Sequence, residues 1–63
     1  MTINCIAVDD EPAALDLISS YIEHTPFLKL EGRYNNAISA LKDIHENPQL
    51  HLVFLDIRMP DLN

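Results

Sequence analysis

Acidic residues directly follow two apolar segments of this 63-residue chain. Asp9 and Asp10 come after the run from Ile3 to Val8, and Asp56 comes after the run from Leu50 to Leu55. If both runs are neighbouring strands of a parallel sheet, their carboxyl ends meet at the edge where such sheets bind ligands. Carboxylates gathered there repel one another unless a cation lies among them. The spacing therefore predicts a site for a hard divalent cation, with Mg²⁺ as the expected occupant.

A carboxylate beside such a cation can also act as a nucleophile. Attack on phosphorus would form an aspartyl phosphate, while the metal neutralises the charge that moves with the phosphoryl group. Asp56 is the better candidate because it stands alone after its segment, whereas Asp9 and Asp10 form a tandem pair suited to holding a metal. The competing interpretation is that Asp9 and Asp10 only cap a helix, whose N-terminus favours acids, and that Asp56 merely ends a strand.

The hydrophobic pattern indicates the strands that would position these acids. Ile3 to Val8 and Leu50 to Leu55 are apolar on both faces, apart from isolated polar residues, as expected for buried strands of a parallel sheet. Phe27 to Tyr34 alternates, which predicts a half-exposed edge strand. One side of that strand would carry Phe27, Lys29, Glu31 and Arg33, and the other side Leu28, Leu30 and Gly32.

Two amphipathic helices are expected between the strands. Pro12, preceded by two acids, is typical of a first helical turn, and Pro26 should end that helix because the residue before a proline leaves helical geometry. Asn35 and Asn36 can cap the second helix, which Pro48 would end. The apolar stripes are Ala14, Leu15, Ile18, Tyr21 and Ile22 on the first helix, and Ala37, Ile38, Leu41 and Ile44 on the second.

The order strand, helix, strand, helix, strand predicts an α/β fold with a parallel sheet. Right-handed crossovers, together with the polar strand at one edge, place the first strand in the centre and one helix on each face. The third strand then has an unpaired apolar edge. A chain this short buries little surface, and its single cysteine excludes an intramolecular disulfide. We therefore expect a fragment of a larger protein, or a homodimer or swapped oligomer.

Composition argues against several classes of partner. The formal net charge is −6 and only Lys29, Arg33, Lys42 and Arg58 are basic, so this segment is not expected to bind nucleic acid. No apolar run reaches the ~20 residues that a membrane helix requires, and the N-terminus lacks a signal-peptide pattern. Cys5 is expected to be an inert core residue in a reducing cytoplasm. The three histidines do not converge and are expected to be solvated.

Two segments, Val8–Pro12 (VDDEP) and Leu55–Asn63 (LDIRMPDLN), resemble in sequence and separation the receiver domain of bacterial two-component response regulators. The resemblance covers the whole chain. It implies the N-terminal β-α-β-α-β half of a doubly wound, flavodoxin-like receiver fold, with sheet order 2-1-3 out of the complete 2-1-3-4-5. Residues 1–63 would then lack the fourth-strand Ser or Thr and the fifth-strand Lys that contact the phosphoryl group, as well as the usual dimer face.

The resemblance also implies a role for individual residues. Asp56 matches the phospho-acceptor, Asp10 matches the acid that ligates Mg²⁺ directly, and Asp9 matches the acid that reaches the metal through water. Arg58 matches the position whose backbone carbonyl completes the protein ligands, and its guanidinium is not implicated. The phosphoryl donor would be a sensor histidine kinase in the bacterial cytoplasm, and the chain would accept phosphoryl groups without being a turnover enzyme.

The segments Asp9–Ala13 and Arg58–Asn63 look most like response regulators with a LytTR-type DNA-binding output domain, which would lie outside this chain. One alternative is a haloacid-dehalogenase-like Mg²⁺ phosphatase, which also uses an Asp at a strand end. Its signature needs a second Asp two residues after the nucleophile, where this chain has Arg58. Another alternative is an inert assembly piece whose open sheet edge pairs with a second copy.

Overall fold

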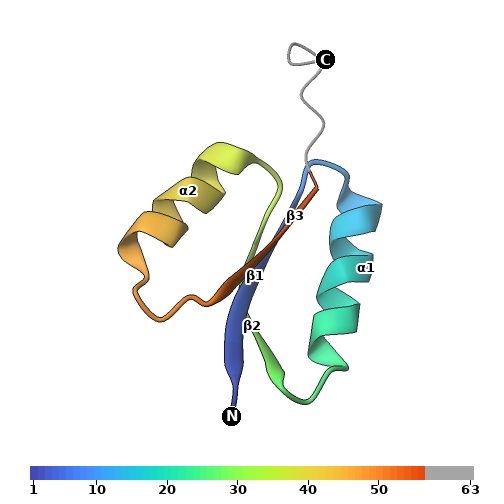
Figure 1. Cartoon of the computed structure of the whole chain (residues 1–63). Coiled ribbons are helices and arrows are strands. Elements are labelled where there is room, and N and C mark those ends of the chain that lie inside the picture. Colours follow the sequence, from blue (N-terminus) through green and yellow to red (C-terminus); the bar gives the residue numbers. More distant parts are fainter. Residues whose placement is uncertain (57–63) are drawn as a thin grey trace.

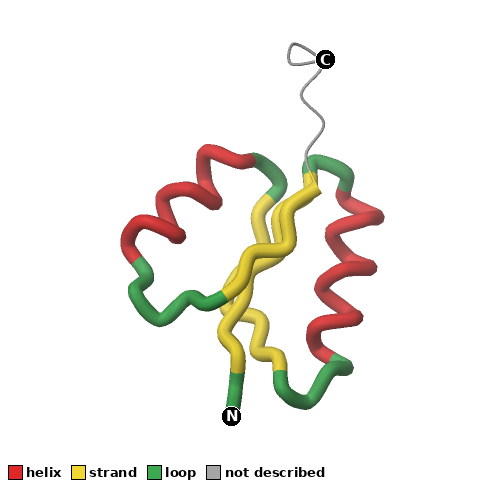
Figure 2. Tube along the Cα trace, in the orientation of Figure 1, coloured by secondary structure: helices red, strands yellow, loops and turns green. Residues whose placement is uncertain are grey.

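The computed structural model describes residues 1–56 of the chain. The three strands form one parallel sheet in the order β2-β1-β3, and the sheet lies between the two helices (Figures 1 and 2). The predicted α/β fold and sheet order are therefore confirmed. In chain order, the elements are β1 (Ile3–Asp9), α1 (Pro12–Glu23), β2 (Leu28–Tyr34), α2 (Ala37–Glu46) and β3 (Leu52–Asp56).

The core lies on both faces of the central strand β1, which is buried from Cys5 to Asp9. Side chains alternate between the faces of a strand, so β1 supplies two separate apolar clusters. On one face, Cys5 and Ala7 pack with Leu15 and Ile22 of α1. On the other face, Ile6 and Val8 pack with Ala40 of α2. This two-sided burial is the physical reason why β1 is a nearly continuous apolar run.

Helix α1 has the predicted bounds. Pro12 occupies the first turn, where its missing N–H removes no helical hydrogen bond, and the N-cap Glu11 makes no side-chain cap. At the other end, the backbone N–H of His24 donates to the Ser20 carbonyl, and the Thr25 hydroxyl donates to the Tyr21 carbonyl at 2.7 Å. These bonds satisfy carbonyls that the last turn leaves unpaired.

Helix α2 begins as predicted, but it presents a different face to the sheet. The Asn36 side chain accepts a hydrogen bond from the Ser39 N–H at 2.9 Å, which is the expected cap. The buried residue of the helix is Ala40, whereas Ile38 is 82% exposed and Leu41 and Ile44 are also exposed, so the predicted stripe is wrong for these three residues. The small Ala40 side chain allows the helix to approach β1 closely.

Tyr21 is a similar exception on α1. We expected it to pack on the apolar stripe, but its side chain is exposed. It borders an apolar groove between α1 and Phe54 of β3, so it lies at the margin of the core and not within it.

A bulge in β2 changes which face its residues occupy. Cys5 pairs with Leu30 but Ile6 pairs with Gly32, so the register skips one residue of β2. Leu30 packs in the α1-side cluster, while Tyr34 packs in the α2-side cluster. Our expectation of one uniform alternation is therefore wrong, because an extra residue reverses the faces of all residues after it.

The bulge brings two side-chain contacts into place. Arg33 forms an ion pair with Asp16 of α1, and the Tyr34 hydroxyl donates a hydrogen bond to Asp43 of α2 at 2.7 Å. Consecutive residues of β2 thus contact the helices on opposite faces of the sheet. The bulge therefore lets the edge strand hold both helices.

Replacement of Gly32 by Ala should destabilise the fold by about 1 kcal/mol. An added Cβ would lie 3.1 Å from the Tyr34 hydroxyl oxygen and 3.2 Å from its ring. That ring cannot move freely, because it packs against the α2-side cluster and its hydroxyl is bonded to Asp43. Urea denaturation followed by circular dichroism measures the change in the free energy of unfolding. In a Tyr34→Ala background, Gly32→Ala should cause much less destabilisation, because the ring that the new Cβ would meet is absent.

The Tyr34–Asp43 hydrogen bond should make stability depend on pH in the alkaline range. The bond to Asp43 is the main cause that raises the pKa of the Tyr34 phenol above its usual value, with smaller contributions from burial and from the Asp43 charge. The folded state therefore holds this proton more tightly than the unfolded state does. The resulting stabilisation is complete below the unfolded-state pKa and is lost as pH rises through the folded-state pKa.

The free energy of unfolding, measured as a function of pH for the native chain and for Tyr34→Phe, tests this prediction. The native chain should lose stability in the alkaline range more steeply than the variant. Equal slopes for the two proteins would contradict it.

Candidate functional site

Two of the predicted site residues end neighbouring strands. Asp9 is the last residue of β1, Asp56 is the last residue of β3, and the two are register partners in the parallel pairing. Figure 1 shows these strand ends at the same end of the sheet, next to the loop that leads into α1. The fold therefore brings the backbones of Asp9 and Asp56 side by side, as the sequence predicts.

Asp9 is a buried carboxylate with one oxygen in use. Only 3% of the residue is exposed, and Oδ1 accepts a hydrogen bond from the Glu11 N–H at 2.9 Å. This bond stabilises the turn before α1, but it reaches the N–H of the N-cap residue itself, and the helix has no side-chain cap. The second oxygen, Oδ2, is buried and has no hydrogen-bond partner among residues 1–56. Burial of an unpaired polar atom costs free energy, so capping alone does not account for the arrangement.

The other acids of this loop are exposed. Asp10 and Glu11 follow Asp9 directly, and both side chains face solvent. In the described part of the chain, two basic side chains form salt bridges: Lys29 pairs with Glu31, and Arg33 pairs with Asp16. Neither salt bridge involves the acids of the loop after β1. The end of the sheet is thus a negatively charged region that no described basic side chain neutralises.

The remaining candidates lie at or beyond the limit of the described residues. The backbone of Asp56 is placed by its strand pairing, and Arg58 lies outside the described residues. Within residues 1–56, no three described His, Cys, Asp or Glu side chains form a group that could hold a metal ion. The predicted trio includes Asp56, whose side chain is not among those described.

Whether these residues could bind a cation depends on which carboxylate oxygens of Asp9 other donors already occupy. A hard divalent cation or its bound water binds a carboxylate oxygen that other donors leave free. Oδ2 of Asp9 is such an oxygen, since Oδ1 alone makes the bond to the turn. The exposed Asp10 beside it adds a second hard oxygen donor. These two described donors are thus of the type that Mg²⁺ prefers, and further ligands would have to come from residues whose side chains are not described.

A hydrogen-bonded cluster at the opposite end of the sheet keeps these acids in register. The His51 N–H donates to the Asn4 carbonyl at 2.9 Å, and the Asn4 N–H donates to Nδ1 of His51 at 3.0 Å. The Asn4 side-chain amide donates to the Gln49 carbonyl at 3.1 Å. The sequence predicts only a solvated His51. The feature that could have indicated this cluster is Asn4, a polar residue within an apolar strand. The cluster fixes the β1–β3 pairing that places Asp9 beside Asp56.

Cys5 has the inert character expected from the sequence. It is fully buried, and its thiol donates a weak hydrogen bond to the Lys29 carbonyl at 3.4 Å. Burial, and secondarily the charge of Glu31, raise the pKa of the thiol above its usual value. A thiol with a raised pKa and no access to solvent is a poor nucleophile.

Comparison with protein-family models, with curated proteins and with solved structures finds no match for the chain. None of the helices described here is long and apolar enough to cross a membrane. The acids at the ends of the strands, and the two sequence motifs that contain them, are the features of the chain that bear on its function.

Proposed function

We propose that this chain is the N-terminal part of a receiver domain that accepts a phosphoryl group on Asp56. The observation that carries the proposal is the pairing of Asp9 with Asp56 at the carboxyl edge of a parallel sheet, together with the buried Oδ2 of Asp9, to which no described group donates a hydrogen bond. Ligand sites of open α/β sheets lie at this edge. The resemblance of VDDEP and LDIRMPDLN to receiver motifs supports the same assignment.

The proposed reaction transfers one phosphoryl group. A carboxylate oxygen of Asp56 attacks phosphorus, forming a P–O bond and an acyl phosphate. The bond between phosphorus and the leaving group breaks, and the leaving group takes the electron pair. With phosphohistidine as donor, the leaving group is an imidazole, which takes up a proton from solvent.

Residues of the loop after β1 would hold Mg²⁺ beside the acceptor. We assign direct ligation to Asp10 and contact through water to Asp9, with Asp56 and the Arg58 backbone carbonyl as further ligands. A bound divalent cation offsets the repulsion among these carboxylates and the negative charge of the incoming phosphoryl group. Asp9 contributes a carboxylate that the Glu11 N–H already holds in one orientation.

The biological context follows from the receiver assignment. The donor would be a sensor histidine kinase, and the compartment would be the bacterial cytoplasm. Phosphorylation would control a DNA-binding output domain of the LytTR type outside the 63 residues, and hence transcription. The described acidic surface near the site gives no reason to expect direct contact between this segment and DNA.

Incubation of the chain with Mg²⁺ and acetyl phosphate, followed by mass spectrometry, tests the proposal. The expected product carries one phosphoryl group on Asp56, and hydroxylamine should remove it, as it does with acyl phosphates. Repeated release of phosphate from many phosphoesters would instead support the phosphatase alternative. No modification with either Mg²⁺ or Mn²⁺ would contradict phosphoryl acceptance by this chain.

A further inference from the structure

A cluster of hydrogen bonds joins the first residues of β1 to the loop that leads into β3. The ladder between these two strands begins at the pair of Cys5 and Leu52. Asn4 and His51 each lie one residue before this pair. The His51 N–H donates to the Asn4 carbonyl at 2.9 Å, and the Asn4 N–H donates to the imidazole Nδ1 of His51 at 3.0 Å. A histidine side chain thus supplies the acceptor for a backbone N–H just before the ladder.

The bond from the Asn4 N–H fixes the protonation state of the His51 ring. A backbone N–H always carries its hydrogen, so Nδ1 must offer it a lone pair. Neutral imidazole has one such acceptor nitrogen, whereas both nitrogens of the imidazolium are donors. The ring of His51 is therefore neutral, with its hydrogen on Nε2, whenever this bond is present. Because histidine changes its charge between about pH 5 and pH 8, the ring can lose this acceptor in mildly acidic solution.

The other histidine with a described hydrogen bond responds to a proton in the opposite way. Nδ1 of His24 lies 2.7 Å from the Ser20 carbonyl oxygen at the end of α1. A carbonyl oxygen can only accept, so this nitrogen carries a hydrogen and keeps the bond when the ring is protonated. The helix dipole also favours a positive charge there, and likewise at His45 in the last turn of α2. Mild acid should therefore weaken the cluster at His51 but not the ends of the helices.

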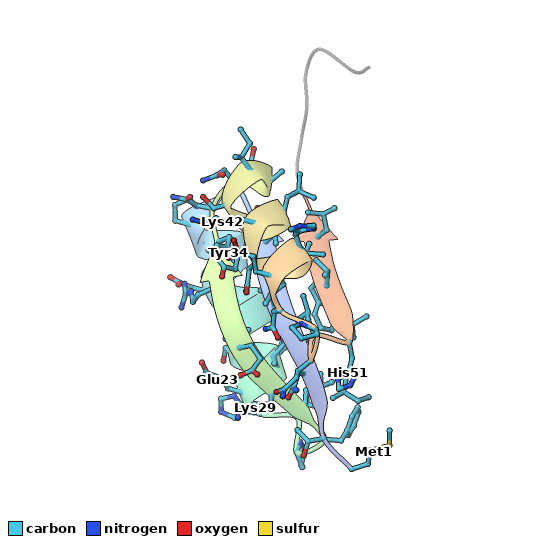
Figure 3. The ribbon with its side chains drawn as sticks, turned by 90° about the vertical axis from the view of Figure 1, so that its left-hand side faces the viewer. Met1, Glu23, Lys29, Tyr34, Lys42 and His51 are labelled. Atoms are coloured by element: carbon cyan, nitrogen blue, oxygen red, sulfur yellow. The ribbon has the colours of Figure 1, made fainter. Side chains whose placement is uncertain are left out.

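No charged group within residues 1–56 forms a salt bridge or a hydrogen bond with the His51 ring. Figure 3 shows His51 on the β3 side of the sheet, and Lys29 and Glu23 on the β2 side. The charged groups and histidines at this end of the sheet are the Met1 amine, Glu23 and His24 near the end of α1, Lys29 of β2, and His45 and Glu46 of α2. The bond from the Asn4 N–H is thus the described interaction that a proton on His51 changes.

We propose that His51 is a proton-sensitive latch on the pairing of β1 with β3. Neutral His51 accepts from the Asn4 N–H and holds the loop before β3 against β1. A proton from solvent on Nδ1 would set two donors face to face, so the ring turns away and the Asn4 N–H bonds to water. The Asn4 side-chain amide still donates to the Gln49 carbonyl at 3.1 Å. The start of the β1–β3 pairing therefore opens more often in mild acid, while the fold persists.

The tautomers of the histidine rings give the first test. In the ¹⁵N-labelled chain at about pH 8, where histidine is neutral, long-range ¹H–¹⁵N spectra should show the hydrogen of His51 on Nε2 and that of His24 on Nδ1. A neutral His51 ring with its hydrogen on Nδ1 would overturn the proposal, because that nitrogen could not accept from Asn4. This measurement uses the native chain and needs no variant.

Hydrogen exchange of the Asn4 amide, followed by NMR, measures the opening itself. Its protection factor, which corrects for the intrinsic effect of pH on exchange, should fall roughly fivefold between about pH 8 and about pH 5.5, since one hydrogen bond is lost. The Ser39 N–H is an internal control, because its acceptor, the Asn36 side chain, does not titrate. A constant protection factor at Asn4, or an equal fall at Ser39, would contradict the proposal.

Two variants of residue 51 separate the effect of the proton from that of the side chain. In His51→Asn, Oδ1 is as many bonds from the backbone as Nδ1 is, so it can accept from the Asn4 N–H in both conditions. Protection at Asn4 should then be independent of pH. His51→Ala has no acceptor, so protection should be low throughout. His24→Asn is the matched control and should keep the pH dependence of the native chain. An equal fall in His51→Asn and the native chain would overturn the proposal.

Discussion

Asp56→Asn is expected to abolish phosphorylation of the chain by acetyl phosphate in the presence of Mg²⁺. The amide of Asn is not nucleophilic, so no acyl phosphate can form at this position. The backbone of residue 56 pairs with Asp9 through main-chain groups, which the substitution keeps. Intact-mass spectrometry should therefore show modification of the native chain and none of the variant, while circular dichroism should show the same fold.

Asp16→Asn is the matched control for this experiment. Asp16 is an exposed carboxylate on α1 that pairs with Arg33, so the control removes an equal charge from a side chain outside the Asp9–Asp56 pair. It should be phosphorylated as the native chain is. Equal modification of Asp56→Asn and the native chain would show that another residue is the acceptor.

Asp9→Asn should change stability in opposite directions with and without Mg²⁺. Without the metal, the variant should be more stable than the native chain by about 1 kcal/mol, because the substitution removes a buried charge whose Oδ2 has no partner in the described part of the chain. Its amide oxygen can still accept the hydrogen bond from the Glu11 N–H. The native chain should gain about 1.4 kcal/mol when Mg²⁺ is raised to roughly ten times its dissociation constant, and the variant should gain much less.

Urea denaturation across a series of Mg²⁺ concentrations measures both effects. Glu23→Gln is the control, since it removes one unit of charge at the last residue of α1, far from the carboxyl edge of the sheet (Figure 3). The control should respond to Mg²⁺ as the native chain does. If Asp9→Asn also gains the full Mg²⁺ stabilisation, Asp9 does not take part in metal binding.

The order of elements and the order of strands were predictable because each depends on hydrophobic patterns that extend over many residues. Runs that are apolar on both faces indicate buried strands, and stripes of helical period indicate the crossovers. The alternation of Phe27 to Tyr34 correctly indicates an edge strand. Turn and cap residues such as Pro12 and Asn36 then set the bounds of the helices closely.

Local geometry was not predictable to the same extent. A single extra residue near Glu31 shifts the register of β2, and the pattern of polar and apolar residues is the same with or without it. The rotation of α2 about its own axis is set by tertiary contacts. Ala40 packs against β1, and Asp43 accepts the hydrogen bond from Tyr34. These contacts override the apparent stripe through Ile38 and Leu41.

At the candidate site, the sequence predicts which acids share an edge but not how each is held. Strand order alone makes the strands that end in Asp9 and Asp56 neighbours, but it does not set the register that pairs these two residues. The burial of Asp9, and the bond from the Glu11 N–H that leaves Oδ2 free, depend on the turn before α1. The cluster of Asn4 and His51 that fixes the register is likewise visible only in three dimensions.

Paramagnetic NMR with Mn²⁺ most directly tests whether the acids at the ends of β1 and β3 form one cation site. Mn²⁺ prefers the same hard oxygen ligands as Mg²⁺ and broadens the signals of nearby nuclei. At substoichiometric Mn²⁺, the amides of Asp9, Asp10 and Asp56 should broaden first, and added Mg²⁺ should restore them. Equal broadening around separate exposed acids such as Glu23 and Glu46, with no preference for the ends of the strands, would contradict the account.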